Sequence, residues 1–494
     1  MHTFTGFIPV RDGVGLAFDA WLPDGASADS PVPAVVTRTP YNRGRYHSLD
    51  GSPWPRVVDA GYAHVGVDVR GRGDSPGVFI PFAHDGYDGY DVVEWVAAQD
   101  WCTGNVGGIG ASYDALTQWW AMRHQPPSLK CAIPIAVSAQ SYGDGNSLAF
   151  GGGVPMPYWI WWFAFLQHGA QRGVVELYWD DVLSHPIADV AVAAGLDESF
   201  QRHWAAYLDG RLGYGVPDCS IDPATVQIPT LVQNGLWDDP QTFQWWEQLV
   251  AASPAKHRLL AGVWDHAGNA APQPVLGGID VAGGTLDPVP IWIDFLDQHL
   301  KDVAPDVTPP VVQIARSGAN TWETHDAWPL HSLPVTHSFG PDAWKHDPAD
   351  PVKQGGGNDL SSANAPLSAS ALDTRADVVS FDLPVASGDE DYSGRPTAML
   401  TIAQEHPGSV VCWLSDIGPD GDGMRIGFWP SAHAHPGGGT QTLDIGLPHV
   451  HHRLLPGHRW RLSVTSSYVP VYAHGLESQE IQLVSGSITL PREQ

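Results

Sequence analysis

Three side chains in this sequence, a serine, an aspartate and a histidine, each follow a predicted strand and could together carry out nucleophilic catalysis. The first is Ser112, within Gly108-Ile-Gly-Ala-Ser112-Tyr-Asp-Ala, which follows a short apolar strand and opens a helix. A sharp strand-to-helix turn of this kind, a nucleophile elbow, raises the serine hydroxyl above the sheet. The usual Gly-x-Ser-x-Gly pattern is incomplete, because Asp114 stands where the second glycine is expected and Ala115 follows it.

A serine hydroxyl becomes a nucleophile only when a base accepts its proton, and the base needs an acid to orient it. Two downstream segments each run from a predicted strand into a loop that presents such a group: Leu231-Val-Gln-Asn-Gly-Leu-Trp-Asp238 and Leu259-Leu-Ala-Gly-Val-Trp-Asp-His266. Parallel α/β sheets place their sites at the carboxyl ends of the strands, and nucleophile, acid and histidine follow one another in this chain order in the α/β-hydrolase fold. We therefore predict Ser112 as nucleophile, Asp238 as orienting acid and His266 as base.

The glycine-rich turn before Ser112 has a second interpretation, because strand-to-helix turns also bind phosphate groups at helix N-termini. The sequence has neither a complete Gly-x-Gly-x-x-Gly pattern nor a P-loop lysine at this turn. The formal net charge of -29 and the lack of a cluster of Lys and Arg disfavour nucleic acid as a partner. We therefore prefer the hydrolytic interpretation and expect a small-molecule ester or amide substrate.

The spacing of apolar residues predicts the elements that would position these groups. Strand-like segments alternate with helix-like segments up to about residue 145. The strand pattern resumes at 228–235 and 257–264, and the amphipathic segment 290–300 follows it. This alternation is typical of an α/β fold with a mostly parallel sheet covered on both faces. We therefore predict an α/β-hydrolase domain in two parts, residues 1–145 and 223–305.

Two further regions have different patterns. Residues 146–222 are rich in aromatic, helix-like pieces and predict a helical cap inserted into the α/β domain. Residues 306–494 contain short alternating runs separated by Pro and Gly, which predicts a C-terminal jelly-roll β-sandwich domain. The stretch 350–373 is rich in Gly, Ser, Asn and Ala, and we expect a surface loop there.

Several predictions concern features that the sequence does not contain. The four cysteines, at positions 102, 131, 219 and 412, form no C-x-x-C pair, so we expect reduced, buried thiols. The histidines at 433, 435, 449, 451 and 452 have no acidic ligand at a known metal-site spacing, so we expect no metal and no cofactor. No apolar stretch is long enough to span a bilayer and the N-terminus has no signal-peptide pattern, so we predict a soluble, cytoplasmic protein without a membrane partner. The sequence leaves open whether it forms a homo-oligomer.

Several motifs together resemble the CocE/NonD family of serine hydrolases, which groups cocaine esterases, X-Pro dipeptidyl-peptidases and α-amino acid ester hydrolases. The resemblance covers nearly the whole chain. The elbow fits the family pattern Gly-x-Ser-Tyr-x-Gly with Ala115 in place of the last glycine, and Gly235-Leu-Trp-Asp238 and Gly262-Val-Trp-Asp-His266 fit the acid and histidine motifs. The other matching stretches are residues 38–41, 68–77, 85–95, 99–107 and 414–421.

The resemblance implies two donors to an oxyanion, the backbone N–H of Tyr113 and the hydroxyl of Tyr41. Apart from the resemblance, the 22 tryptophans favour a substrate pocket walled by some of them, although most tryptophans belong to cores. Our candidates for the pocket wall are Trp119, Trp159, Trp162, Trp237 and the acidic Asp265.

The resemblance leaves the substrate open, since family members cleave aromatic esters, α-amino acid esters, β-lactam side-chain amides or X-Pro peptide bonds. In the α-amino acid ester hydrolases, part of a carboxylate cluster that binds the substrate ammonium lies two and three residues beyond the catalytic acid. Here those positions are Pro240 and Gln241, with Asp239 and Asp265 as the nearest acids. We therefore expect an esterase for neutral, bulky acyl groups. An X-Pro peptidase or amino acid ester hydrolase, an acyltransferase with the same triad and a non-catalytic binding protein remain alternatives.

Overall fold

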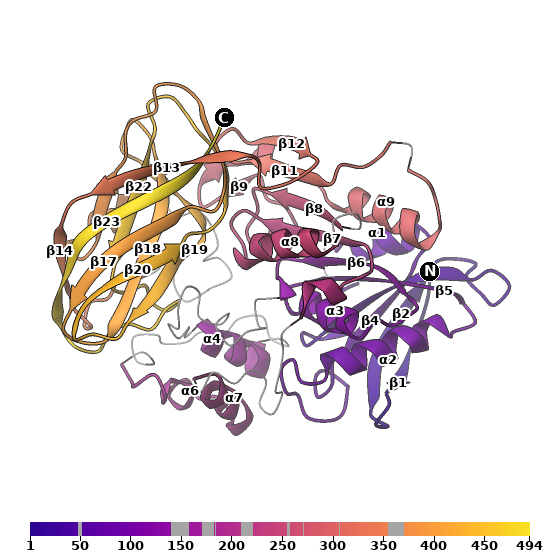
Figure 1. Ribbon diagram of the computed structural model, residues 1–494. Helices are drawn as coiled ribbons and strands as arrows, with labels where there is room; N and C mark the ends of the chain where they lie inside the picture. Colours follow the sequence, from indigo (N-terminus) through magenta and orange to yellow (C-terminus); the bar gives the residue numbers. More distant parts are fainter. Residues whose placement is uncertain are drawn as a thin grey trace.

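A ten-stranded sheet forms the centre of the first part of the chain (Figure 1), in the order β1-β2-β4-β3-β5-β6-β7-β8-β11-β12. Neighbouring strands from β4 to β11 are parallel, whereas β1, β2 and β12 pair in antiparallel fashion at the two edges. The strands are β1 (His2–Pro9), β2 (Gly15–Leu22), β3 (Val32–Thr39), β4 (Ala63–Asp68), β5 (Cys102–Ala111), β6 (Leu129–Ile135), β7 (Thr230–Gly235), β8 (His257–Gly262), β11 (Val312–Arg316) and β12 (Thr321–His325).

The computed structural model describes residues 1–47, 52–139, 158–169, 182, 184–208, 221–253, 257–269, 271–305, 307–353 and 370–494. Three predicted features fall wholly or partly outside these ranges. Cys219 is one, while the other three cysteines are buried free thiols. Residues 354–369 of the expected surface loop are another, although the last residues of that stretch form the short helix α10 (Ser370–Asp373). The third is much of the predicted cap.

Helices cover both faces of the sheet because successive strand residues point to opposite sides. On one face, Ala34, Val36 and Val106 share a core with apolar residues of α2 (Asp85–Ala97), α3 (Tyr113–Arg123) and α8 (Gln241–Ala252). On the other, Val35 and Ile109 pack with residues of α1 (Trp54–Asp59) and α9 (Val289–Leu300). The central strands β3, β4 and β7 are buried at nearly every position because both faces of the sheet are covered, which confirms the predicted α/β class.

The described part of the segment between β6 and β7 is mainly helical, as predicted. It contains α4 (Tyr158–Ala164), a π-helical turn at Phe165–Gly169, α6 (Val190–Ala193) and α7 (Glu198–Leu208). These elements pack on one another through a stacked pair of Phe163 and Phe200 rings and a bond from Trp204 Nε1 to the Ile187 carbonyl oxygen. Figure 1 shows α4, α6 and α7 as one group below the α/β unit and the C-terminal β unit.

The C-terminal part is built from two antiparallel sheets, which confirms the predicted C-terminal β domain. Alternation of buried and exposed residues, as in β17 with its buried Ala398, Leu400 and Ile402, gives each strand one core-facing side. The larger sheet contains β13 (Ser332–Phe339), β14 (Asp342–His346), β16 (Glu390–Gly394), β17 (Thr397–Gln404), β20 (Gly439–Gly446), β21 (Val450–Leu454) and β23 (Gln479–Glu493). The smaller contains β15 (Val379–Asp382), β18 (Gly408–Ile417), β19 (Gly423–His435) and β22 (Arg459–Thr465).

One predicted assignment differs from the structure. The run beginning at Val311 was expected to start the β-sandwich, but β11 pairs in parallel with β8 and, with β12, extends the sheet of the α/β unit. Val312 and Ile314 are fully buried there. A short alternating run predicts a strand but not the sheet that the strand joins, because the same pattern suits either sheet.

Among the described helices, none is long and apolar enough to cross a membrane.

Candidate active site

Four predicted functional residues follow four parallel strands of the central sheet. Tyr41 follows β3, Ser112 follows β5, Asp238 follows β7 and His266 follows β8. These strands lie within the continuous parallel run β3-β5-β6-β7-β8. Because the carboxyl ends of parallel strands meet at one edge, the four residues share that edge, where α/β sheets place their ligand sites.

Ser112 occupies a strained turn between β5 and α3. Its φ of 61° and ψ of -127° lie outside the regions that non-glycine residues prefer. A Cβ on Gly110 would come within 2.6 Å of the Asp114 backbone, and a Cβ on Gly108 would lie 2.0 Å from Gln118 Oε1. At Gly110 the strand and the helix backbone therefore approach so closely that only glycine fits, as the elbow requires.

The missing second glycine of the elbow is compensated within α3. Ala115, the small residue that follows, is completely buried. The Asp114 carboxylate accepts a hydrogen bond from the Tyr46 hydroxyl, so a polar partner accompanies this buried acid. The departure from the family pattern thus leaves the turn at Ser112 intact.

Asp238 and His266 form a directed pair. His266 Nδ1 lies 2.8 Å from Asp238 Oδ1, and Asn269 Nδ2 donates to Asp238 Oδ2 at 2.5 Å. Asn269 is itself held, because Gln233 Nε2 donates to its carbonyl oxygen at 2.6 Å. The Asp238 side chain is 1% exposed and that of His266 is 35% exposed. Asn269 therefore fixes the buried carboxylate, while the imidazole is partly exposed to solvent.

The two members of this pair perturb one another's ionisation. Burial raises the pKa of Asp238 to about 6, although the neighbouring His266 acts in the opposite direction. Burial disfavours the imidazolium form of His266, but the Asp238 carboxylate outweighs it and holds the pKa of the imidazole above its usual value. The Asp238 carboxylate therefore favours the protonated imidazole, as the partner of a histidine base does.

The Ser112 hydroxyl makes no hydrogen bond to His266 within the described ranges of the chain, so the structure brings together the acid and the base but not the complete triad. Such bonds are often long in unliganded hydrolases and shorten when substrate binds. The shared sheet edge and the elbow at Ser112 are the features that relate the serine to the pair.

The side chains of both residues that carry the predicted oxyanion donors contact Trp162. The Tyr113 N–H is at the first position of α3, where no intrahelical acceptor exists. The Tyr113 ring stacks on Trp162 with centroids 5.7 Å apart, and its hydroxyl donates to Asp85 Oδ2 at 2.6 Å. Trp162 Nε1 donates to the Tyr41 hydroxyl oxygen at 3.1 Å. A hydroxyl that accepts one hydrogen bond can still donate its own proton.

Arg72 is a positioning residue that sequence reasoning missed. Its Nε donates to the carbonyl oxygen of Pro40 at 3.0 Å, and its Nη2 donates to that of Leu166 at 2.6 Å. The guanidinium thereby ties the loop that carries Tyr41 to the helical insertion. The segment 68–77 was noted only for its resemblance, and its pattern carries no signal for this contact.

The family comparison extends over most of the chain. Residues 12–268 match the sequence model described as X-Pro dipeptidyl-peptidase (S15 family). Residues 304–492 match that of the X-Pro dipeptidyl-peptidase C-terminal non-catalytic domain. The chain belongs to the S15 family. It is therefore a hydrolase, and the predicted CocE/NonD-type resemblance is confirmed.

Individual relatives agree with this assignment. A cocaine esterase from Rhodococcus sp. (strain MB1 Bresler) is 27% identical over 94% of this chain and 90% of that protein. An aminopeptidase structure from a marine sediment Thaumarchaeota archaeon superposes with a TM-score of 0.83 at 21% identity, covering 100% of this chain and 96% of that one. An α-amino acid ester hydrolase structure gives a TM-score of 0.82 at 22% identity, with the same coverage. These likenesses show a shared fold.

The predicted pocket tryptophans divide into two groups in this S15 protein. Trp162 touches both Tyr41 and Tyr113, and Trp159 packs edge-on against Trp162 with centroids 5.6 Å apart. Trp119 and Trp237 are instead 0% and 1% exposed, so the structure places them in cores and not on a pocket wall. Each of these two indoles has a carbonyl partner that accounts for its buried N–H, Val137 for Trp119 and Arg425 for Trp237.

Asp239 and Asp265, next to the catalytic pair in sequence, accept hydrogen bonds from backbone N–H groups. Asp239 accepts hydrogen bonds from Ser138 N, Gln241 N and Thr242 Oγ1, which caps the start of α8. Asp265 Oδ1 accepts from Gly268 N at 2.7 Å, and the residue is only 9% exposed. The Asp265 carboxylate thus organises the loop that follows His266, and its place on a pocket wall stays a prediction.

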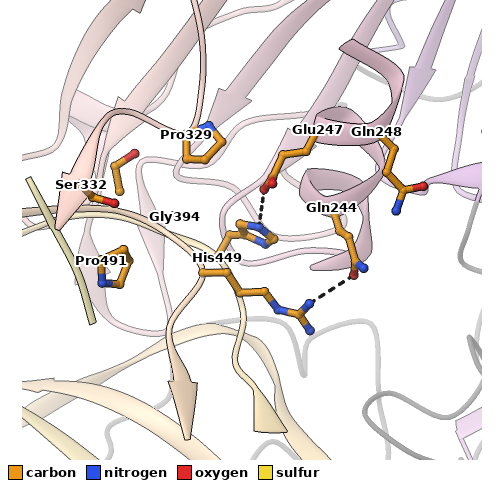
Figure 2. Close-up of a pocket in the computed structure, with 10 residues that line it drawn as sticks. Gln244, Glu247, Gln248, Pro329, Ser332, Gly394, His449 and Pro491 are labelled. Atoms are coloured by element: carbon orange, nitrogen blue, oxygen red, sulfur yellow. Dashed lines mark hydrogen bonds and ion pairs between the residues drawn. The ribbon is translucent and has the colours of Figure 1, made fainter. Parts of the chain in front are cut away.

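A separate cavity of about 480 Å³ lies between α8 and the C-terminal β unit. Figure 2 shows Glu247, on α8, bonded to His449 across it, at 2.8 Å. Gln244, also on α8, accepts from Arg395 Nη1 at 3.4 Å. None of the predicted catalytic residues lines this cavity, so it is distinct from the candidate active site.

The histidine–aspartate pair makes a measurable prediction about ionisation. We expect His266 in isotope-labelled protein to titrate by NMR above the usual value of about 6.5. In Asp238→Asn its pKa should fall below the wild-type value, because loss of the negative charge leaves burial to disfavour the imidazolium. His266→Gln identifies the signal, and Asp19→Asn, at a distant acid, is the control. An unchanged pKa in Asp238→Asn would contradict the described coupling.

Proposed function

We propose that this protein is a serine hydrolase that cleaves esters of neutral, bulky acyl groups through an acyl-enzyme on Ser112. The observation that carries the proposal is the hydrogen-bonded pair of Asp238 and His266 at the sheet edge where the strained elbow presents Ser112. Acid, base and nucleophile at strand ends along one edge of a sheet are the arrangement that acyl transfer needs.

In the proposed mechanism His266 is the general base. Its Nδ1–H donates to Asp238, which leaves the Nε2 lone pair to accept the Ser112 proton as the oxygen attacks the carbonyl carbon. The tetrahedral intermediate collapses when the imidazolium returns this proton to the departing alcohol. A water molecule, deprotonated by the same nitrogen, then attacks the acyl-enzyme and releases the acid and Ser112.

Negative charge develops on the carbonyl oxygen during both attacks. The Tyr113 N–H and the Tyr41 hydroxyl are the proposed donors to that oxygen, and each such donor contributes about 2.7–4 kcal/mol to lowering the barrier. Trp162 and Arg72 support this role, since the indole bonds the Tyr41 oxygen and the guanidinium holds the preceding carbonyl of Pro40.

The surroundings of Tyr41 favour an apolar acyl group. Its ring lies 5.8 Å from that of Phe165, and the nearby Trp162 is buried against Trp159. Asp239 and Asp265, the acids next to the catalytic pair in sequence, are engaged by backbone N–H groups. A free substrate ammonium would need a carboxylate partner, because an unpaired buried charge is costly.

Peptidase chemistry is the second candidate, and the family match favours it. The S15 model is described as X-Pro dipeptidyl-peptidase, and the proposed triad and donors would serve an amide as well as an ester. Recognition of a peptide N-terminus distinguishes the two candidates, because it requires the carboxylate partner described above.

The first test concerns the nucleophile. Ser112→Ala should lower the hydrolysis of p-nitrophenyl acetate by a factor on the order of 10⁴ or more, because no other group supplies the attacking oxygen. The melting temperature should not fall, since alanine keeps the Cβ and the Ser112 hydroxyl bonds no side chain within the described residues. Ser30→Ala, at an exposed serine, is the matched control. Full activity in Ser112→Ala would exclude the proposed mechanism.

The second test compares the methyl esters of phenylacetic acid and phenylglycine, which differ by one amino group. We expect kcat/KM to be at least about tenfold higher for the phenylacetic ester, a difference of about 1.4 kcal/mol. Asp239→Asn and Asp265→Asn should leave this ratio unchanged, with thermal melting to verify folding. Preference for the phenylglycine ester, lost in either variant, would favour the peptidase alternative instead.

A further inference from the structure

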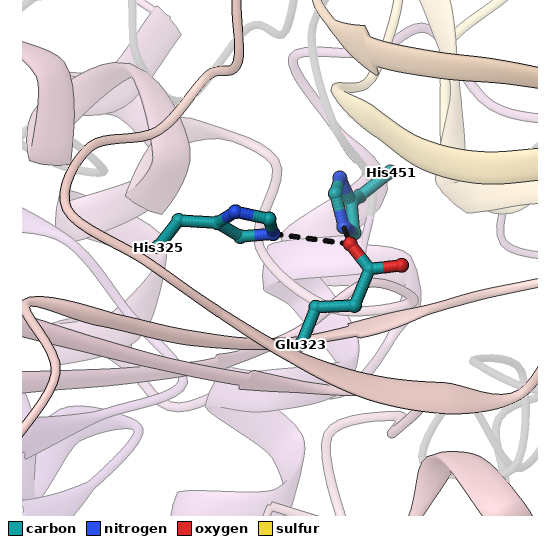
Figure 3. A group of neighbouring side chains, drawn as sticks. All are labelled: Glu323, His325 and His451. Atoms are coloured by element: carbon teal, nitrogen blue, oxygen red, sulfur yellow. Dashed lines mark hydrogen bonds and ion pairs between the residues drawn. The ribbon is translucent and has the colours of Figure 1, made fainter.

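The last strand of the central sheet meets the C-terminal β unit at a cluster of two histidines and a glutamate. Glu323 and His325 are two residues apart on β12, so their side chains lie on the same face of the strand. His451 comes from β21 of the larger C-terminal sheet. Figure 3 shows the His325 and His451 rings turned toward the Glu323 carboxylate from two sides.

The three polar atoms of this cluster are close enough to share one ion. His325 Nε2 lies 3.0 Å and His451 Nε2 3.2 Å from Glu323 Oε2. One ligand atom from each residue lies within 4.8 Å of the others. Ligands about 2.0–2.2 Å from a tetrahedral zinc ion lie roughly 3.3–3.6 Å apart, so small side-chain shifts would suffice.

The surroundings of the cluster orient these side chains. Arg316 donates to both Glu323 oxygens, at 2.6 and 2.9 Å, and fixes the plane of the carboxylate. Ser393 Oγ lies 3.4 Å from His451 Nδ1, the nitrogen that faces away from the cluster. Outer partners of this kind orient the ligands of protein metal sites.

The local charge also admits a cation. The Arg316 guanidinium faces three carboxylates, Glu323, Glu493 at 2.8 Å and Asp391 at 3.6 Å. Arg453 also pairs with Asp391, at 2.7 Å, so two positive charges meet three negative ones beside the two imidazoles. His451 is fully buried, whereas the Glu323 and His325 side chains are 24% and 23% exposed, which leaves an open side for entry and for a water ligand.

We propose that Glu323, His325 and His451 bind one divalent transition-metal ion of the Zn²⁺ type. Two imidazoles and a carboxylate suit this class of ion, with water completing the coordination. His325 pairs with Val312 at the amino end of β11, hence away from the carboxyl edge that carries Ser112 and His266. The ion would therefore be structural and would join β12 to β21, across the seam between the two units.

The sequence around His451 predicts no metal site, because the neighbouring histidines have no acidic ligand at a known metal-site spacing. The structure gives those neighbours other partners, Glu247 for His449 and Asp416 for His452. The other two residues of the cluster, Glu323 and His325, come from a segment far from His451 in the sequence. Only the fold brings that segment against β21.

Zinc binding to the purified full-length protein, stripped with a chelator and dialysed, tests the proposal. Isothermal titration with ZnCl₂ should show one ion bound per chain, and the melting temperature should rise with zinc because the ion binds only the folded cluster. His325→Gln keeps a polar group beside Glu323 but should weaken zinc binding by roughly 100-fold or more, since even outer-shell changes cost 10–100-fold. His331→Gln, at an exposed histidine outside the cluster, should bind like the wild type.

Cobalt substitution gives a readout that does not depend on the folding of a variant. Co²⁺ added to the stripped wild-type protein should produce the visible absorption of a bound ion with nitrogen and oxygen ligands, and zinc should displace it. The proposal is overturned if the wild-type protein binds no stoichiometric zinc or cobalt. It is equally overturned if His325→Gln binds zinc as tightly as His331→Gln. In that case two N–H groups donating to one carboxylate oxygen account for the cluster.

Discussion

The buried carboxylate of Asp238 is the group on which the candidate active site depends. A charge with 1% exposure is tolerated only if both oxygens are hydrogen-bonded, and here His266 and Asn269 supply those bonds. Removing one partner of a buried pair costs about 3–5 kcal/mol, so the loops after β7 and β8 are held to a fixed separation. Two backbone bonds reinforce them, from Leu236 N to the Gly262 oxygen and from Trp237 N to the Trp264 oxygen.

The other two units of the molecule help to hold this edge of the sheet. The Trp237 indole, one residue before the acid, donates to the carbonyl oxygen of Arg425 on β19 of the C-terminal β unit. Arg72 joins the Tyr41 loop to Leu166 of the helical insertion. A C-terminal domain described in the family as non-catalytic thus supports the loop of the proposed catalytic acid.

The sequence predicted those features that follow from local pattern. Continuous apolar runs predicted the parallel strands, and the strand ends predicted where Ser112, Asp238 and His266 would lie. The sequence did not predict the features that depend on contacts between residues far apart in the chain. Trp119 and Trp237 are of a residue type common in pockets but fill cores, and β11 joins a sheet that its pattern does not specify. Glu323, a partner of His451, lies 128 residues away from it in the sequence. Arg72 was missed because a side chain that bonds two carbonyl groups has no sequence signature.

Covalent labelling tests the central claim most directly, namely that the elbow and the buried pair make Ser112 a nucleophile. A fluorophosphonate probe should modify the folded protein once, with the adduct located on the peptide that contains Ser112. Labelling should slow as the pH falls through the pKa of His266, because the imidazolium cannot accept the serine proton. Absence of labelling in folded protein that hydrolyses esters, or an adduct on another residue, would contradict the account.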